Sequence, residues 1–306
     1  KLNGENIMER KKKCFWNPYK IFESLAMRGF FKNMNDKEYL SWLYRARMGR
    51  FPDLNHPKSF NEKLQWLKLN DRKPEYTEMV DKYLAKKYVE KRIGEKYIIP
   101  TLGVWDKFDQ IEFEKLPDQF VLKTTHDSGG VVICKDKANF DKAAAKRKLE
   151  KSLKRNYYWA EREWPYKNVK PQIIAEKFMV DKSGDGLIDY KFYCFNGMPE
   201  FLYISNGMDN HKTARLSFLT MNWGKAPFGR SDYLEFETIP PRPRKFDEMV
   251  QIAKSLSEGH PFLRVDLYET SEQVYFSELT FSPCGGFMPF VPEGWDEKLG
   301  DMINIC

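Results

Sequence analysis

The sequence has few cysteines and no long apolar run. The first shortage argues against a disulfide-bonded secreted protein, and the second against a membrane-spanning one. The cysteines number five in 306 residues and form no Cys-x-x-Cys pair; they are Cys14, Cys134, Cys194, Cys284 and Cys306. An odd, scattered set of thiols indicates reduced cysteines in a cytoplasm rather than a disulfide framework. No stretch approaches the roughly 20 apolar residues that a bilayer span requires, and the pattern of a secretory signal is missing. We therefore expect a cytoplasmic protein.

The chain also lacks a single dominant basic tract, although its formal net charge is +7. Its 44 acidic residues, and the spread of the basic ones along helical patterns, argue against nucleic acid as a partner. The exception is the basic segment 10–13, which aromatic residues follow: Phe15, Trp16, Tyr19, Phe22, Phe30 and Phe31. Such a segment can rest on an anionic membrane surface, or it can be a helix whose aromatic side chains pack on the body. Both interpretations stay open.

The composition is that of a globular enzyme-sized body, with 42% hydrophobic residues and two or three lobes expected from the length. Apolar spacing predicts that residues 1–95 are mainly helical, with breaks at prolines. Short strands are expected after residue 98, at 120–123, 131–134, 173–175, 190–195, 200–205, 263–268 and 273–279, and helices at 139–156 and 246–256. The pair 190–195 and 200–205 should form a hairpin around Asn196-Gly197. This mixture predicts an α+β chain.

A glycine pair lies between two of the expected strands. Ser128, Gly129 and Gly130 follow the strand that contains Lys123. Glycines allow a close backbone approach, and their N–H groups can cradle phosphate oxygens beside the positive charge of the lysine. The segment is not a P-loop, because no Gly-Lys-Ser/Thr opens a following helix. Taken alone, it also fits a plain turn.

Two acidic residues are expected to meet in the last strand pair. Strand alternation places Arg264, Asp266 and Tyr268 on one face, and antiparallel pairing would bring Glu278 to the same side. Adjacent carboxylates repel unless they share a cation or a proton, and Mg²⁺ bridges carboxylates to phosphates. The alternative is a pair of solvated strand positions, which the apolar residues flanking both acids disfavour.

Taken in order, these segments resemble the ATP-grasp superfamily of carboxylate–amine ligases. The resemblance runs from about Asp81 to Phe287; its pieces are Asp81-Lys82, Ile99-Pro100, Lys123 with the Ser-Gly-Gly-Val loop, Ile174 to Phe178, Asp189 to Lys191, Phe195 to Gly197, Arg264 to Asp266, and Glu278. The stretches 60–64, 125–130 and 162–166 look like the teichuronopeptide-biosynthesis (TupA-like) branch. The resemblance implies an ATP-grasp fold of two α+β lobes clasping ATP, with a helical N-terminal region at 1–95, a small lobe at 96–172 and a C-terminal lobe at 173–306.

The resemblance also implies roles for individual residues. The implied ATP-binding residues are Lys82, Lys123, Ser128, Gly129, Gly130, Glu176, Lys177, Phe178 and Lys191. The implied metal ligands are Asp266, Glu278 and Thr280, and the implied catalytic residues are Arg264 and Lys191. Either Asp181 or Asp185 would contact the ribose. One departure concerns Thr280, because the family usually has asparagine there and a hydroxyl is a weaker Mg²⁺ ligand than an amide carbonyl.

The implied reaction uses ATP and Mg²⁺ to activate a carboxylate as an acyl phosphate, which an amine then attacks. The branch implies an amide between an amino acid or peptide and a uronic acid of a bacterial surface polysaccharide. Two alternatives belong to other classes: a glycosyltransferase of polysaccharide assembly, and a non-catalytic nucleotide- or polysaccharide-binding module. Basic residues in loop-like stretches are expected to form a groove for the polyanion; they are Arg162, Lys167, Lys170, Arg242, Arg244 and Lys245.

Overall fold

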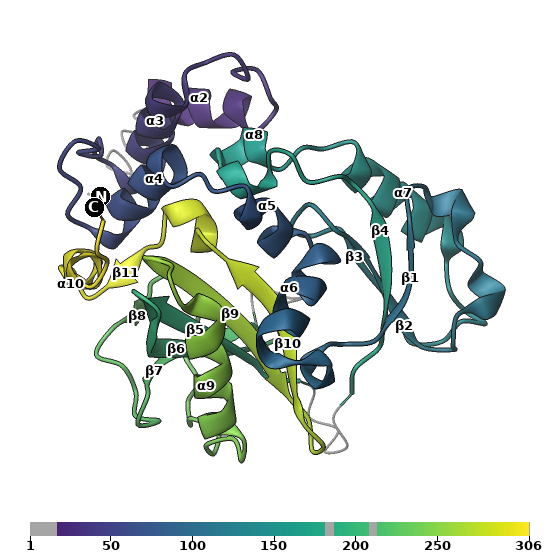
Figure 1. Ribbon diagram of the computed structural model, residues 1–306. Coiled ribbons are helices and arrows are strands. Elements are labelled where there is room, and N and C mark those ends of the chain that lie inside the picture. Colours follow the sequence, from purple (N-terminus) through teal and green to yellow (C-terminus); the bar gives the residue numbers. More distant parts are fainter. Residues whose placement is uncertain (1–16, 181–186, 208–212, 306) are drawn as a thin grey trace, which may run out of the picture.

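The computed structural model describes residues 17–180, 187–207 and 213–305. Within that part the chain forms antiparallel sheets with helices around them (Figure 1), which confirms the predicted α+β class. The two main sheets lie side by side, and the helices within residues 18–70 lie above the larger one in this view. The described part of residues 1–95 is mainly helical, as predicted; its helices are α2 (Pro18–Ala26), α3 (Asp36–Met48), α4 (Phe60–Asn70), α5 (Glu75–Val80) and α6 (Leu84–Ile93).

Capping residues set the starts of three N-terminal helices. Asn17 and Asn35 accept hydrogen bonds from backbone N–H groups in the first turns of α2 and α3. Ser59 and Glu62 form a reciprocal capping box at the start of α4. Each cap satisfies backbone donors that the beginning of a helix leaves free.

The smaller sheet has the strand order β1-β4-β2-β3. Its strands are β1 (Thr101–Trp105), β2 (Phe120–Thr124), β3 (Val131–Cys134) and β4 (Ile173–Lys177), and helix α7 (Lys142–Leu153) packs against it. The strands predicted at 120–123, 131–134 and 173–175 are thus confirmed. Because β4 pairs with both β1 and β2, it belongs to this sheet, and we propose that the lobe boundary follows Lys177 instead of falling before residue 173.

The larger sheet has the strand order β10-β9-β5-β6-β7. Its strands are β5 (Asp189–Phe195), β6 (Met198–Asn206), β7 (Arg215–Thr220), β9 (Phe262–Glu269) and β10 (Val274–Thr280). The predicted hairpin around Asn196-Gly197 is confirmed, and both of these residues have positive φ, at 48° and 81°. The other elements are α8 (Tyr158–Glu161), the short pair β8 (Gly229–Arg230) and β11 (Phe290–Val291), α9 (Phe246–Ser257), α10 (Trp295–Asp301) and the 3₁₀ turns η1 (Glu95–Tyr97), η2 (Phe108–Gln110), η3 (Phe113–Lys115), η4 (Trp164–Tyr166) and η5 (Pro283–Gly286).

Helices pack on both faces of the larger sheet, and one face changes character along β9. Val265 and Leu267 belong to the core that α9 completes, whereas Phe262 packs in a second core with side chains of α4 and α10. Arg264 and Asp266 lie on the same face as Phe262, because side chains alternate along a strand. That face is therefore apolar at one end of β9 and charged farther along, which is where the candidate site begins.

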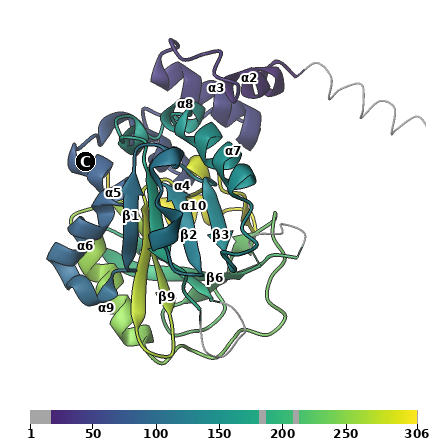
Figure 2. The same cartoon turned by 90° about the vertical axis from the view of Figure 1, so that its right-hand side faces the viewer.

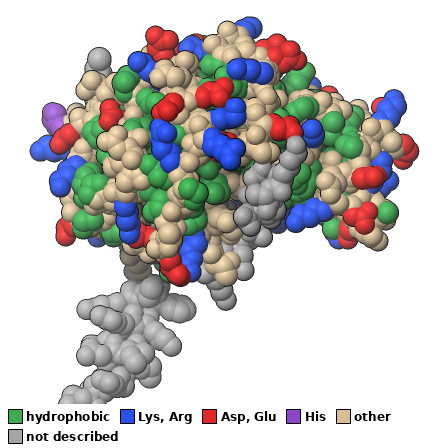
Figure 3. All heavy atoms as spheres, turned by 90° about the horizontal axis from the view of Figure 1, so that it is seen from below, with side chains coloured by type: hydrophobic (Ala, Val, Ile, Leu, Met, Phe, Trp, Pro, Cys, Tyr) green, Lys and Arg blue, Asp and Glu red, His purple; other side chains and the backbone are tan. Residues whose placement is uncertain are grey.

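The surface carries both signs of charge. In Figure 3 basic and acidic side chains intermingle over the face shown, in agreement with the absence of a single basic tract from the sequence. Helices α2 and α3 lie at the opposite end of the molecule from α9 in Figure 2. Among the described residues, no helix combines the length and the apolar character needed to cross a membrane.

Candidate active site

A buried carboxylate lies at the centre of the charged part of the larger sheet. Asp266 has no exposed surface; Nε and Nη2 of Arg264 each lie 2.7 Å from its oxygens, and Nζ of Lys191 lies 2.6 Å away. Burial alone would raise the pKa of Asp266, but these two cations outweigh it and hold the pKa below its usual value. Burial likewise opposes the charge of Lys191, yet Asp266 and Asp189 raise the pKa of Lys191 well above its usual value. Arg264 and Lys191 are therefore fixed positive charges.

The neighbouring strand β10 brings Glu278 and Thr280 to this cluster. Glu278 pairs with Asp266 and Thr280 with Arg264 in the antiparallel register, as the sequence predicts for the two acids. The Glu278 side chain is one-third exposed, and its nearest cation is Nη2 of Arg264, at 3.8 Å. The hydroxyl oxygen of Thr280 is buried and has no hydrogen-bond partner among the residues that the structure describes.

These side chains fit a magnesium ion that ATP helps to hold. Among the described residues no group of three or more His, Cys, Asp or Glu side chains converges on one point, so a site made by such side chains alone is not available there. Mg²⁺ commonly takes only one or two carboxylates together with substrate phosphates and water. A carboxylate offers about four lone-pair sites, so Asp266 has room beyond its three donors. Glu278 and the unpartnered hydroxyl of Thr280 add oxygens beside it.

A second charged cluster lies on the smaller sheet. Glu176 of β4 is buried, and its two oxygens contact Nζ of Lys86 at 2.5 Å and Nζ of Lys123 at 2.7 Å. Burial would raise the pKa of Glu176, but the two lysines outweigh burial and lower it. Lys86 also donates to the carbonyl of Ile99 and the hydroxyl of Thr101, at 2.7 and 2.9 Å. Glu176 thus orients two lysines on one side of the sheet.

The sequence reasoning selected Lys82 and missed Lys86. Lys86 could have been found from its position four residues after Lys82, because that spacing places it one turn farther along the chain, in the first turn of α6. Lys86 points to β1 and β4, whereas Lys82 points to the glycine loop, where its Nζ donates to the carbonyl of Asp127.

The glycine loop is anchored at its base and exposed at its tip. The carboxylate of Asp127 accepts short hydrogen bonds from the hydroxyls of Thr124 and Ser152, and the N–H of Thr124 donates to the carbonyl of Gly130 at 2.8 Å. Gly130 is buried, but Ser128 and Gly129 are exposed. The backbone at the tip is therefore open to a ligand.

The remaining expected residues follow β4. Lys177 is exposed and Phe178 half-buried, and both border an open hollow of about 660 Å³. Asp181 and Asp185, the two candidates for ribose contact, lie outside the described residues. Among the described residues no hydrogen bond or ion pair links the two charged clusters, which the structure places on the two neighbouring sheets.

The expected basic groove is wrong for one of its six members. Arg162 has no exposed surface, because its guanidinium is enclosed by the rings of Tyr39, Tyr158 and Trp159 at 4.2 to 5.3 Å from their centroids. Among the six, only Lys167 borders the hollow of about 740 Å³ between the N-terminal helices and α8. Local sequence does not reveal this burial, since one of the rings around Arg162, that of Tyr39, comes from a distant helix.

A buried acid–base pair was also missed. Lys68 is buried, and its Nζ donates to the side chain of Gln65 at 3.0 Å and to the carbonyls of Glu161 and Gly285 at 2.9 and 2.5 Å. Glu163 is 4% exposed, and burial raises its pKa to about 8 although the charge of Lys68 opposes the rise. Glu163 belongs to the stretch 162–166 that the sequence singles out without a role.

A family model and several solved structures match the chain. The model described as "TupA-like ATPgrasp" matches residues 62–304. No curated protein sequence matches.

Three of the matching structures illustrate the range. D-alanine–D-alanine ligase from Bacillus anthracis complexed with ATP is 16% identical with a TM-score of 0.37, over 66% of this chain and 55% of that chain. The RimK domain ATP-grasp protein from Sphaerobacter thermophilus DSM 20745 is 11% identical with a TM-score of 0.40, over 74% and 69%. The ADP complex of purK, N5-carboxyaminoimidazole ribonucleotide synthetase, is 16% identical with a TM-score of 0.41, over 72% and 50%. The chain thus spans about half the length of the first and third of these proteins.

Proposed function

The chain belongs to the TupA-like ATP-grasp family, and on that premise we propose that it is an ATP-dependent ligase that joins a carboxylate to an amine through an acyl phosphate. We further propose that the product is an amide between an amino acid or peptide and a uronic acid of a bacterial surface polysaccharide. The observation that supports this most is the register of β9 and β10, which sets Glu278 opposite Asp266 beside two fixed cations and an unpartnered hydroxyl.

The proposal gives each cluster a task. Lys82, Lys123 and the backbone of residues 128–130 bind the ATP phosphates, and residues 176–178 form the hinge beside the adenine. Asp266, Glu278 and Thr280 hold Mg²⁺, which when bound neutralises charge on the β- and γ-phosphates. Catalysis then consists of positioning and charge stabilisation, as is general for phosphoryl transfer.

The reaction proceeds in two balanced steps. An oxygen of the substrate carboxylate attacks the γ-phosphorus of ATP, the bond to the bridging oxygen breaks, and ADP leaves. The amine then attacks the acyl carbon, phosphate leaves, and the nitrogen loses a proton. Lys191 and Arg264 stay charged throughout and stabilise the negative charge that develops in both steps. The exposed loop tip at Ser128 and Gly129 is suited to shield the acyl phosphate from water.

We also propose that the protein works in the cytoplasm, at the inner membrane surface. Apolar side chains are exposed at the end formed by α2 and α3, and Tyr19 of α2 packs edge-on against Trp42 and Phe51. The exposed apolar residues there are Ile21, Met27, Phe30, Trp42 and Phe51. Such a patch suits peripheral contact with lipid.

The deciding experiment measures ADP release across a panel of uronic acids and amino acids. Glu278→Gln is expected to stay folded and to lose Mg²⁺-dependent turnover, because it removes one ligand charge. Asp266→Asn is expected to lose turnover as well, and also stability, because it leaves Arg264 and Lys191 without a buried counter-charge, a change that costs about 3–5 kcal/mol at such sites. Near-normal ADP release by either variant at saturating Mg²⁺ would contradict the metal role of that residue.

The same panel separates the alternatives. ATP binding without ADP release for any pair of substrates would favour a non-catalytic binding module. Consumption of a sugar nucleotide would favour a glycosyltransferase, although the acids at 181 and 185 do not keep the Asp-x-Asp spacing of such enzymes.

A further inference from the structure

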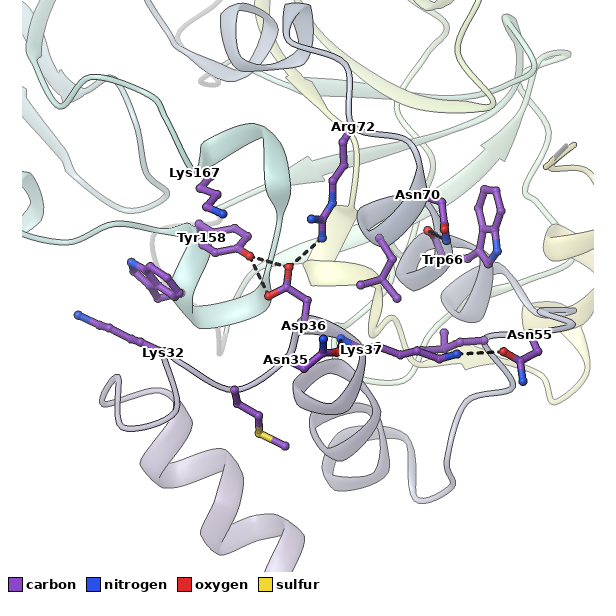
Figure 4. A pocket seen from close by; sticks show the side chains of 14 residues that line it. Lys32, Asn35, Asp36, Lys37, Asn55, Trp66, Asn70, Arg72, Tyr158 and Lys167 are labelled. Atoms are coloured by element: carbon purple, nitrogen blue, oxygen red, sulfur yellow. Dashed lines mark hydrogen bonds and ion pairs between the residues drawn. The ribbon is translucent and has the colours of Figure 1, made fainter.

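A hollow in the described part of the chain lies between the N-terminal helices and α8. It has a volume of about 740 Å³, within the range of about 300–1,000 Å³ of small-ligand sites. Its walls come from α3, α4, α8 and the loops that flank them (Figure 4). None of the residues proposed for ATP or metal lines it. It is therefore a separate feature that needs its own explanation.

The lining combines aromatic rings with cations. Three aromatic side chains border the hollow, namely Trp66, Tyr158 and Trp159, and so do four cations, namely Lys32, Lys37, Arg72 and Lys167. Nζ of Lys32 lies 6.0 Å from the ring centroid of Trp159, and Nζ of Lys167 lies 5.1 Å from that of Tyr158. Each of these rings thus has an exposed ammonium group beside it.

The one acid in the lining is already neutralised. The carboxylate of Asp36 accepts from the hydroxyl of Tyr158 at 2.7 and 2.8 Å and from Nη2 of Arg72 at 2.8 Å. Figure 4 shows this carboxylate between Tyr158 and Arg72, with Lys32 and Lys167 on the Tyr158 side. The hollow consequently presents a net positive charge.

A buried arginine, Arg162, contacts several of the residues that line the hollow. Nη2 of Arg162 donates to the carbonyls of Phe31 and Lys32, at 2.7 and 3.2 Å, and its Nε lies 3.5 Å from Oδ1 of Asp36. Its guanidinium also packs against the rings of Tyr158 and Trp159, 5.3 and 4.8 Å from their centroids. One side chain therefore holds the lysine backbone, the acid and both rings, so these groups are positioned before any ligand binds.

We propose that this hollow binds an acidic saccharide, a uronate segment of the acceptor glycan, through ring stacking on the half-buried indoles of Trp66 and Trp159 and ion pairs with the lysines; Tyr158 is buried and only orients Asp36. This inference rests on the proposed function for the identity of the glycan. The aromatic faces suit the apolar face of a sugar ring, and the ammonium groups suit its carboxylate. A single strand of nucleic acid also combines stacking with charge, but it needs a groove of cations that follows the backbone, whereas these cations surround one hollow.

The test is a calorimetric titration of the full chain with trigalacturonate, which needs neither ATP nor turnover. The double variant Lys32→Ala/Lys167→Ala is expected to lose at least about tenfold in affinity, the equivalent of about 1.4 kcal/mol. The matched control Lys91→Ala/Lys254→Ala removes the same charge from exposed positions on α6 and α9 and is expected to bind like the wild type. Equal losses in both double variants, or no binding by the wild type, would overturn the proposal.

Two further ligands sharpen the result. Maltotriose, which has no carboxylate, is expected to bind at least tenfold more weakly than trigalacturonate, and equal binding would overturn the role of the lysines. Tighter binding of an oligothymidylate would overturn the saccharide assignment. The protein could bind trigalacturonate through Lys32 and Lys167 and yet release no ADP. That result would refute the proposed reaction but would still support an acidic saccharide as the ligand of the hollow. ADP release with a monomeric uronate but no trigalacturonate binding would do the reverse.

Discussion

The lysines near the proposed ATP site differ in what each contacts: Lys86 and Lys123 share Glu176, whereas Lys82 donates to a carbonyl of the glycine loop. Each lysine is therefore substituted separately. Lys123→Ala and Lys82→Ala are each expected to weaken binding of a non-hydrolysable ATP analogue by about 1.5–3 kcal/mol, because a charge-assisted contact to phosphate is lost. Lys86→Ala should act similarly, since Lys86 shares Glu176 with Lys123. Lys87→Ala is the matched control, because Lys87 is exposed on the same helix. Calorimetric affinities equal to that of the Lys87 variant would contradict the assignment.

A second residue-scale feature concerns acid stability. His260 is 4% exposed and packs against the rings of Tyr76 and Phe281, and its buried Nδ1 has no hydrogen-bond partner within the described part of the chain. Burial, together with the cations Lys73 and Arg92, lowers the pKa of His260 to about 4, although the charge of Asp71 opposes the change. The folded protein therefore keeps this imidazole neutral where the unfolded chain protonates it.

The neutral imidazole of His260 makes the folded protein less stable at acid pH. Above pH 6.5 neither state binds the proton, and between pH 6.5 and about 4 only the unfolded state does, so the free energy of unfolding falls as the pH falls through this window. At about 1.4 kcal/mol per pH unit, the loss amounts to at most about 3.5 kcal/mol. His260→Phe should remove it while keeping the aromatic packing. Urea unfolding at pH 7 and pH 4.5 measures both proteins, and an unchanged pH dependence in the variant would exclude His260 as the cause.

At the scale of elements, the two loop glycines are required for different reasons: Gly130 because of the space around it, and Gly129 because of its backbone conformation. A Cβ on Gly130 would lie 1.8 Å from the hydroxyl of Thr124 and 2.8 Å from Asp127, inside the hydrogen bonds that anchor the loop. A Cβ on Gly129 would meet nothing within 4 Å, but its φ of +94° disfavours any side chain. Gly130→Ala is therefore expected to lower both the melting temperature and ATP affinity. Gly129→Ala should cost only the backbone strain, about 1–2 kcal/mol.

These expectations can be compared in one thermal and calorimetric series. The glycine proposal fails if Gly130→Ala matches the wild type in both measurements. It also fails if Gly129→Ala is the more damaging of the two substitutions.

The sequence predicts where the strands lie better than it predicts which strands pair with one another. Alternation of polar and apolar residues, with antiparallel pairing, predicts that Asp266 and Glu278 come to one side of the strand pair, and the two residues do lie opposite each other. Their register depends on a shift between Phe276 and Glu278, which alternation does not predict. The short apolar strand at 173–175 carries no sign in its sequence of which sheet it joins, so the lobe boundary expected before residue 173 and the one that we propose after Lys177 differ in where they place β4. Pairing between strands distant in sequence decides that membership.

Buried charges are the other part that local patterns do not reveal. Arg162 looked like a surface cation in a loop, but its partners lie more than 120 residues earlier, at Tyr39 and Asp36. Lys86 and Glu163 are likewise ordinary surface types by composition, and only tertiary contacts bury them. The resemblance to a family supplied what spacing could not, namely roles for lysines on two separate sheets. Those roles remain predictions until binding is measured.

At the scale of the whole molecule, two sheets each carry one charged cluster, and a third feature, the cationic hollow, lies at the N-terminal end. The family match begins at residue 62, so Lys32, Asp36 and Lys37 of the hollow precede it. The hollow therefore combines residues inside and outside the matched region. This division suggests that the matched part supplies the activation chemistry, while the helices before it contribute to the choice of acceptor.

That division leads to a prediction about salt. The net charge is +7, and on the face shown in Figure 3 cations are mixed with acids. Because four cations and one acid line the hollow, we expect the hollow to contribute most to the attraction of a polyanion. Raising the salt from 0.1 M to 1 M shortens the Debye length from about 10 Å to about 3 Å. The Michaelis constant for an oligouronate acceptor is thus expected to rise steeply over this range, while that for the amino acid barely moves. In Lys32→Ala/Lys167→Ala the acceptor constant should start higher and respond less to salt. A steep slope that survives in this variant would assign the steering to cations elsewhere on the surface.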